Sequence, residues 1–210
     1  MQVTYLFDPL CGWCYGAGPA IGRIAELDGV TVKLAPTGLF AGAGARPMEA
    51  SFAAYAWQND QRIARLTGQP FTEDYRRKVL GASGGLFDSA LATLGIVAAG
   101  LEDESREIEI LKAIQAARYQ DGRDIADRAV IADILDEAGL TKAANRVRSP
   151  DAELLAAYDV RVAVGRAEFE RFGFEGVPSL VVEDEAGRRP LRGNALFGSF
   201  EQLAQHLKAA

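Results

Sequence analysis

The chain has 210 residues, of which 49% are hydrophobic, and a formal net charge of −6. This length and apolar content are sufficient to bury a full core, so we expect one domain, or one domain that carries a large insertion. The negative charge provides no basic field for phosphate groups, which argues against nucleic-acid and anionic-membrane partners.

The N-terminus indicates a compartment. It lacks the basic lead, the apolar stretch and the small-residue cleavage site of a secretory signal. No segment of the sequence contains the roughly eighteen consecutive apolar residues that a membrane-spanning helix requires. We therefore expect a cytoplasmic protein, and in the cytoplasm a cysteine pair is more often catalytic than structural.

The first sixteen residues predict a strand followed by a redox-active pair. Residues 3–7 are apolar, β-branched or aromatic and indicate a buried strand that ends at Asp8. Cys11 and Cys14 follow, and they are the only cysteines of the chain. In the first turn of a helix, residues three apart lie within disulfide-bonding distance. The spacing therefore favours thiol-disulfide chemistry at a helix start.

The two cysteines are expected to have different roles. If the helix begins at Cys11, its unpaired amide groups and the positive end of its dipole stabilise a thiolate on this residue. Cys11 is then the nucleophile, and Cys14, one turn deeper, resolves the mixed disulfide. Two other interpretations remain open from the residues alone: a pair of inert, buried thiols, or a zinc site that would need the lone His206 and further ligands. We expect no metal.

Two neighbouring side chains have alternative roles. Trp13 either packs on a bound substrate or closes the flank of the site. Asp8 lies three residues before Cys11, where it caps the helix, forms a turn, or relays a proton to Cys14 during resolution.

The following segments predict a βαβ unit. A helix should extend from Cys14 to about Leu27, with a bend at Pro19. The alternation in residues 30–36 predicts a second strand, parallel to the first because a helix connects them. Residues 38–47 are rich in glycine and alanine and are expected to form a loop over one edge of the site.

The middle of the chain predicts successive helices. Apolar residues recur with a 3.6-residue period, and Asp127 is placed to cap one of these helices. The region contains no internal repeat and no low-complexity linker, so we expect it to pack on the core. We assign residues 47–148 to a helical insertion domain and residues 1–46 and 149–210 to the domain that contains it.

The last part of the chain returns to the sheet. Ser149 and the proline after it predict the start of a long helix, with Ser149 as its cap. Residues 179–182 and 188–193 predict a β-hairpin, which a closing helix follows. Pro178 either marks the start of the first of these strands in trans, or forms a cis bond with Val177 that exposes the Val177 backbone to a ligand.

These segments resemble a thioredoxin fold of the DsbA superfamily, an α/β fold with a large all-helical insertion. The resemblance covers essentially the whole chain. It rests on DPLCGWCY at residues 8–15, YQDGRDI at 119–125, EAGL at 137–140 and GVP at 176–178. Within the superfamily, the chain is most similar to the FrnE-like, predicted cytoplasmic dithiol-disulfide oxidoreductases.

The resemblance implies roles for the same residues. It implies that Cys11 attacks, that Cys14 resolves, and that Pro178 is a cis proline facing them. Comparable proteins usually have a proline after the first cysteine, whereas this chain has Gly12. Their redox potentials therefore cannot be carried over. Because neither residue between the cysteines is a cation, we expect a potential nearer that of thioredoxin, about −270 mV, than that of DsbA, about −120 mV.

The expected function is that of a thiol-disulfide oxidoreductase that acts in the reductase or isomerase direction on protein or glutathione substrates. We expect the protein to need no cofactor beyond the Cys11–Cys14 disulfide, with glutathione as a candidate co-substrate. A substrate strand would pair with the backbone of Val177. One alternative is a kappa-type glutathione-dependent transferase or isomerase, which this architecture also resembles but which generally has a serine in place of Cys11. The other is a non-catalytic, redox-sensing binding module.

Overall fold

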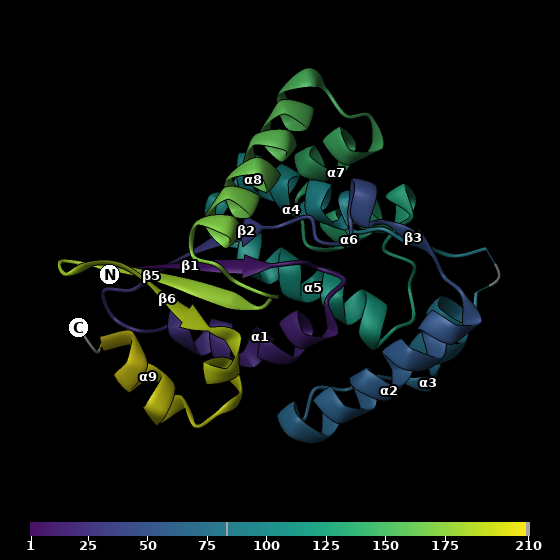
Figure 1. Ribbon diagram of the computed structural model, residues 1–210. Helices are drawn as coiled ribbons and strands as arrows, with labels where there is room; N and C mark the ends of the chain where they lie inside the picture. Colours follow the sequence, from purple (N-terminus) through teal and green to yellow (C-terminus); the bar gives the residue numbers. More distant parts are fainter. Residues whose placement is uncertain (83, 209–210) are drawn as a thin grey trace.

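The structure, a computed structural model, describes residues 1–82 and 84–208 (Figure 1). Its centre is a four-stranded mixed sheet in the order β2-β1-β5-β6. The strands are β1 (Gln2–Phe7), β2 (Thr31–Pro36), β5 (Ser179–Asp184) and β6 (Gly187–Arg192). β1 is parallel to β2, while β5 is antiparallel to both β1 and β6. The predicted parallel pair and the predicted hairpin are therefore confirmed.

Burial on both faces holds β1 in the middle of the sheet. Its side chains are buried from Val3 onwards, which explains why its apolar run does not alternate with polar residues. Leu6 packs with Ala35 and Val181, whereas Val3 and Phe7 belong to the larger core around α1. In Figure 1, α8 (Ala152–Arg171) lies across one face of the sheet, and α1 (Gly12–Ala25) and α9 (Phe200–Lys208) lie across the other. The buried strand β1 therefore fixes the position of the segment that follows it, which contains Cys11 and Cys14.

Helix α1 begins at Gly12, directly after Cys11, and ends two residues before the predicted Leu27. It contains Pro19 and ends at Ala25 instead of Leu27. Gly29 then takes a positive φ of 73°, a conformation that favours glycine and turns the chain towards β2. The bend at Pro19 stays a prediction.

Between β2 and α8 the chain is mainly helical, which confirms the predicted insertion. The helices are α2 (Ala50–Thr67), α3 (Glu73–Tyr75) with the π-helical turn Arg76–Leu80 after it, α4 (Ala90–Glu102), α5 (Glu107–Tyr119), α6 (Arg128–Glu137) and α7 (Thr141–Arg148). Two short strands, β3 (Arg46–Pro47) and β4 (Leu86–Phe87), form an antiparallel pair that the sequence did not predict. Because β3 crosses the expected boundary at residues 46 and 47, the division into domains stays a prediction.

One predicted helix cap is confirmed and another is wrong. The carboxylate of Asp127 accepts a hydrogen bond from the backbone N–H of Ala129 at 2.8 Å, at the start of α6. Ser149 instead follows the end of α7, and Asp151 is the residue before α8. The Asp151 carboxylate accepts from the N–H of Leu154 at 2.8 Å. A charged carboxylate at a helix N-terminus is a stronger acceptor than a hydroxyl, which accounts for the later start.

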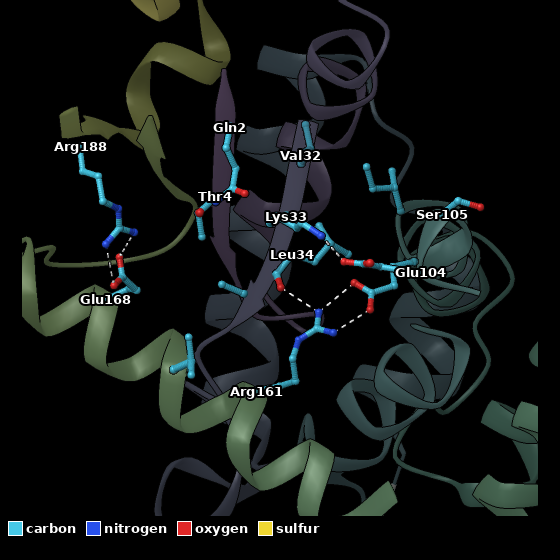
Figure 2. A pocket seen from close by; sticks show the side chains of 14 residues that line it. Gln2, Thr4, Val32, Lys33, Leu34, Glu104, Ser105, Arg161, Glu168 and Arg188 are labelled. Atoms are coloured by element: carbon cyan, nitrogen blue, oxygen red, sulfur yellow. Dashed lines mark hydrogen bonds and ion pairs between the residues drawn. The ribbon is translucent and has the colours of Figure 1, made fainter. Parts of the chain in front are cut away.

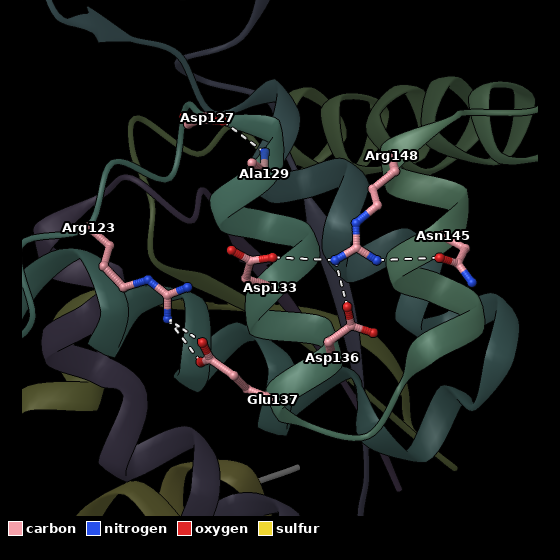
Figure 3. A network of polar contacts seen from close by, with 8 residues as sticks. All are labelled: Arg123, Asp127, Ala129, Asp133, Asp136, Glu137, Asn145 and Arg148. Atoms are coloured by element: carbon pink, nitrogen blue, oxygen red, sulfur yellow. Dashed lines mark hydrogen bonds and ion pairs between the residues drawn. The ribbon is translucent and has the colours of Figure 1, made fainter.

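Ion pairs brace the insertion and join it to the sheet. Arg161 on α8 donates to both carboxylate oxygens of the buried Glu107 on α5, at 2.7 and 2.8 Å. The same guanidinium donates to the carbonyl of Leu34 in β2 at 2.8 Å (Figure 2). Farther out, Arg148 on α7 contacts Asp133 and Asp136 on α6 (Figure 3). The insertion is therefore held against the sheet through α5 and α8.

Candidate active site

The cysteine pair lies at the junction of β1 and α1. Cys11 immediately precedes the helix, and Cys14 is in its first turn. The N–H of Cys11 donates to the carbonyl of Asp8 at 3.1 Å, and the carbonyl of Cys11 accepts from the N–H of Tyr15 at 3.0 Å. The predicted helix start is confirmed. The first amide groups of a helix have no acceptor within it, and here they are the ones nearest to Cys11.

The two thiols differ in exposure. Cys11 retains 8% of its surface, whereas Cys14 retains 1%, and both are free thiols. Burial raises the pKa of Cys14 well above its usual value, and the neighbouring Cys11 raises it further. The deeper thiol is therefore held in its protonated form, and a disulfide from solution meets Cys11 first. This asymmetry is consistent with the predicted order of attack and resolution.

A cis peptide bond faces the pair from the other end of the chain. The bond between Val177 and Pro178 is cis, as the family resemblance implied. The thiol of Cys11 donates to the carbonyl of Val177, with 3.6 Å between sulfur and oxygen. Gly193, after β6, allows the close approach of this loop, because a Cβ atom there would lie 2.0 Å from the carbonyl oxygen of Pro178. The fold therefore brings together residues that are 166 positions apart in the sequence.

Trp13 forms one wall of a groove beside the cis proline. A cavity of about 330 Å³ is lined by Trp13, Val177 and Pro178 together with residues of the Gly193 turn. The indole packs edge-on against Phe197, with 5.2 Å between ring centroids. Trp13 thus contacts the flank of the site and also lines an open groove, so a role in substrate contact stays a prediction.

Asp8 forms a turn rather than a helix cap. Its buried carboxylate accepts hydrogen bonds from the N–H of Leu10 at 2.9 Å, the N–H of Phe40 at 3.0 Å and the hydroxyl of Ser89 at 2.8 Å. The helix-cap interpretation is wrong, because the residue that precedes α1 is Cys11. Burial raises the pKa of Asp8, although these three hydrogen bonds oppose the increase. The contact with Phe40 confirms that the loop of residues 38–47 lies at an edge of the site.

The sequence did not indicate a polar cluster that the insertion places beneath the cysteines. Tyr119 on α5 donates to the carbonyl of Leu10 at 2.7 Å. Tyr75 on α3 donates to the carboxylate of Asp60 on α2 at 2.9 Å. Asp60 is 5% exposed and Arg118 is 1% exposed. The available signal was a pair of charged residues on otherwise apolar helix faces, namely Asp60 near Ile63 on α2 and Arg118 on α5.

Comparison with known families gives a match over almost the entire chain. Residues 2–208 match the DSBA-like thioredoxin domain. The chain belongs to this family. The family membership accounts for the mixed sheet and the helical insertion between β2 and α8. A comparison with curated protein sequences gave no match.

Solved structures extend this family assignment. The cytosolic disulfide reductase DsbM from Pseudomonas aeruginosa is 32% identical, with 100% of each chain covered and a TM-score of 0.86. A structure of the same reductase with glutathione gives a TM-score of 0.85 over 99% of this chain and 98% of that one, at 32% identity. A protein from Nitrosomonas europaea, provisionally described as a protein disulfide isomerase, is 26% identical over 99% of this chain and 95% of its own, with a TM-score of 0.78. None of the helices in the described part of this chain is long and apolar enough to cross a membrane.

Proposed function

We propose that this DSBA-like protein is a thiol-disulfide oxidoreductase that uses Cys11 and Cys14 and works in the reductase or isomerase direction. The observation that carries the proposal is the unequal burial of two free thiols at the start of α1, opposite the cis Pro178. A shallow thiol next to unpaired helix amides suits attack, and a deep thiol one turn later suits resolution. The family match and the description of DsbM as a disulfide reductase support the same chemistry.

The reaction transfers two electrons in two exchange steps. The Cys11 thiolate attacks one sulfur of the substrate disulfide, forms a mixed disulfide and releases the other substrate sulfur as a thiolate. Cys14 loses its proton and attacks the Cys11 sulfur, which forms the Cys11–Cys14 disulfide and releases the second substrate thiolate. The substrate is reduced and the protein is oxidised. Two external thiols, for which we propose glutathione, reduce the protein again and become a disulfide.

We assign removal of the Cys14 proton to Asp8. After burial and the neighbouring Cys11, Asp8 is the residue that acts on the pKa of Cys14: its backbone lowers this pKa and the charge of its carboxylate raises it, so the carboxylate and the thiol are neighbours. Burial raises the pKa of the Asp8 carboxyl, so it is a better proton acceptor than an exposed aspartate. Its hydrogen bonds to Phe40 and Ser89 hold the carboxylate in place.

For substrate binding we propose strand addition at the cis-proline loop. The carbonyl of Val177 is within reach of Cys11, and an extended peptide can pair with this backbone while its disulfide approaches the thiol. Pro178 keeps its own nitrogen out of that pairing because proline has no N–H. Trp13 then packs along the bound peptide, since it lines the same groove.

We further propose a cytoplasmic location and membership of the FrnE-like group. The 32% identical DsbM is described as cytosolic and was solved with glutathione, and in the cytoplasm a glutathione pool is available as the reductant. The motifs in the insertion support the FrnE-like assignment. We do not favour the kappa-type alternative, because a glutathione-dependent transferase or isomerase of that type does not require a second cysteine such as Cys14.

A mass-resolved redox titration against glutathione buffers tests the proposal. We expect a two-electron transition between the dithiol and the Cys11–Cys14 disulfide, with a midpoint nearer about −270 mV than about −120 mV. Absence of the disulfide at every ratio would contradict the proposal. A persistent glutathione adduct on Cys11 would favour the kappa-type alternative. As a second test, Cys14→Ser should accumulate mixed disulfides with substrates, whereas a binding module would form none.

A further inference from the structure

Helix α2 of the insertion packs directly on the active-site helix. A Cβ atom at Gly12 would lie 2.5 Å from Oδ1 of Asp60 and 3.2 Å from Cδ1 of Ile63. One turn later, a Cβ atom at Gly16 would lie 2.6 Å from Cγ2 of Ile63. Real Cβ atoms essentially never make contacts of 2.5 or 2.6 Å, so the two glycines allow α2 to approach α1. Asp60 therefore occupies the space that a side chain at position 12 would need.

A carboxylate at such a close helix contact needs compensating partners. Tyr75 on α3 donates to Oδ2 of Asp60 at 2.9 Å, and the charge of Arg118 on α5 lies close enough to lower the pKa of this carboxyl. The other titratable or charged groups of this region are Tyr119 on α5, Asp124 after α5, the cysteine pair on α1, and Arg62 on α2, whose guanidinium lies 5.8 Å from the centre of the Trp13 ring. Burial is the largest effect, and it raises the pKa of Asp60 to about 7. The carboxyl is therefore poised to gain or lose a proton near neutral pH.

Arg118 shows why the charged form of Asp60 matters. Its Nε and Nη2 atoms are buried and have no hydrogen-bond partner in the described part of the chain. The guanidinium lies over the rings of Tyr75 and Phe87, at 5.4 Å from each centroid. A buried cation without a counter-charge is costly, and Asp60 attracts it across Tyr75. The insertion thus presents an Asp60–Tyr75–Arg118 cluster to the first turn of α1.

We propose that Asp60 is a positioning residue of the insertion, whose negative charge disfavours the Cys11 thiolate and makes the protein a stronger reductant. This inference rests on the proposed exchange function. The carboxylate lies against Gly12, the residue bonded to Cys11. A negative charge held beside the start of α1 opposes the formation of a second negative charge there. The disulfide form carries no thiolate, so the repulsion weakens only the reduced form and lowers the reduction potential.

The sign of the pH dependence follows. Below about pH 7, Asp60 is protonated, the repulsion is absent, and the dithiol form is stabilised. Above about pH 7, Asp60 is ionised, and the balance shifts towards the disulfide. Because coupling is reciprocal, oxidation of the cysteine pair must in turn lower the pKa of Asp60.

The test compares Asp60→Asn with Asp74→Asn. Asparagine keeps the shape and the acceptor for Tyr75 but removes the charge, and Arg118 then acts on the thiolate without its counter-charge. We expect Asp60→Asn to raise the equilibrium constant for disulfide reduction about tenfold, which corresponds to about +30 mV in a glutathione titration. In a Cys14→Ser background, the pH profile of Cys11 alkylation should shift about one unit lower. Asp74 is an exposed acid paired with Arg77 and Lys78, and Asp74→Asn should shift neither quantity.

Two results would overturn the inference. One is a folded Asp60→Asn variant with an unchanged midpoint and alkylation profile, and the other is a shift of either quantity in the opposite direction. If the variant does not fold, the unaltered protein provides the second measurement. A carbon-13 titration of the Asp60 carboxyl should show its midpoint about one pH unit lower in the oxidised form than in the reduced form, and equal midpoints would contradict the coupling. If the unaltered protein formed no Cys11–Cys14 disulfide at all, this result would instead contradict the proposed exchange function.

Discussion

The two sides of the active site differ in how they are built. On the sheet side, the end of β1, the cysteine pair and the cis-proline loop meet through backbone groups, such as the carbonyl of Val177 that faces Cys11. On the insertion side, side chains make the contacts, with Ser89 on Asp8 and Asp60 against Gly12. Backbone contacts follow from the fold and tolerate sequence change, whereas side-chain contacts depend on individual residues. We therefore expect residues on the sheet side to carry out disulfide exchange, and residues on the insertion side to change its rate and its redox potential.

The largest effect should come from the sheet side. Cys11→Ser removes the nucleophile, so reduction of a small disulfide with glutathione as the electron donor should fall by at least about a thousandfold. Cys14→Ser should keep the first exchange step, because Cys11 remains the more accessible thiol. The single-turnover rate with a chromogenic disulfide measures this step. Retention of turnover in Cys11→Ser would contradict the assignment of the nucleophile.

The second prediction concerns the insertion side, where Asp60 should make the unfolding free energy depend on pH. Folding raises the pKa of Asp60 to about 7, so this group stabilises the folded state below its unfolded value of about 4, and the stabilisation is lost as the pH rises through about 7. Relative to Asp60→Asn, the unaltered protein should lose on the order of 1–4 kcal/mol of unfolding free energy between pH 4 and pH 7.5. Urea denaturation at both pH values measures the difference. The exposed Asp74, whose pKa is lowered by Lys78, should show no such loss.

A third prediction tests the contact between the two sides. Gly16→Ala places a methyl group 2.6 Å from Ile63 and should lower the unfolding free energy by about 1–3 kcal/mol through overpacking. Gly18→Ala on the same helix is the matched control, because the nearest atom is 3.7 Å away on the side chain of Gln69. It should stabilise the protein by about 0.5–1 kcal/mol through helix propensity. Equal effects of the two substitutions would mean that α2 does not press on α1 as described.

The smallest effect concerns the hydrogen bond from the insertion to Asp8. Ser89→Ala should cost about 1 kcal/mol of unfolding free energy and raise the pKa of Asp8 further, since the lost hydrogen bond lowers that pKa. If Asp8 accepts the proton of Cys14, the rate of resolution should change while the rate of attack by Cys11 does not. Ser105→Ala removes a comparable hydrogen bond to the exposed Asp103 and should leave both rates unchanged.

The same contrast explains what the sequence could predict. The strand, the cysteine spacing and the helix start were predictable because they lie within sixteen consecutive residues and depend on local periodicity and turn chemistry. The cis bond at Pro178 needed the family resemblance, because nothing local distinguishes it from a trans proline at a strand start. Asp60 and Ser89 were not predicted at all. Periodicity identifies an apolar helix face, but it does not say which face of α2 meets α1 or at what depth.

The cap before α8 is a smaller example. Ser149 and Asp151 both suit a helix start, and the choice between them depends on where α7 ends. Similarly, the pairing of β3 with β4 joins two short segments forty residues apart in the sequence, with no alternating pattern to indicate a strand. These features are set by packing rather than by local propensity.

The contact between Gly12 and Asp60 has a consequence for how this family changes over time. The residues between two redox cysteines are often treated as a portable unit that can be exchanged between proteins. Here the first of them shares its space with a carboxylate from α2, so a larger residue at position 12 requires a smaller one at position 60. Positions 12 and 60 should therefore vary together among related sequences, and a transplanted motif should function only when the residue at position 60 is changed with it.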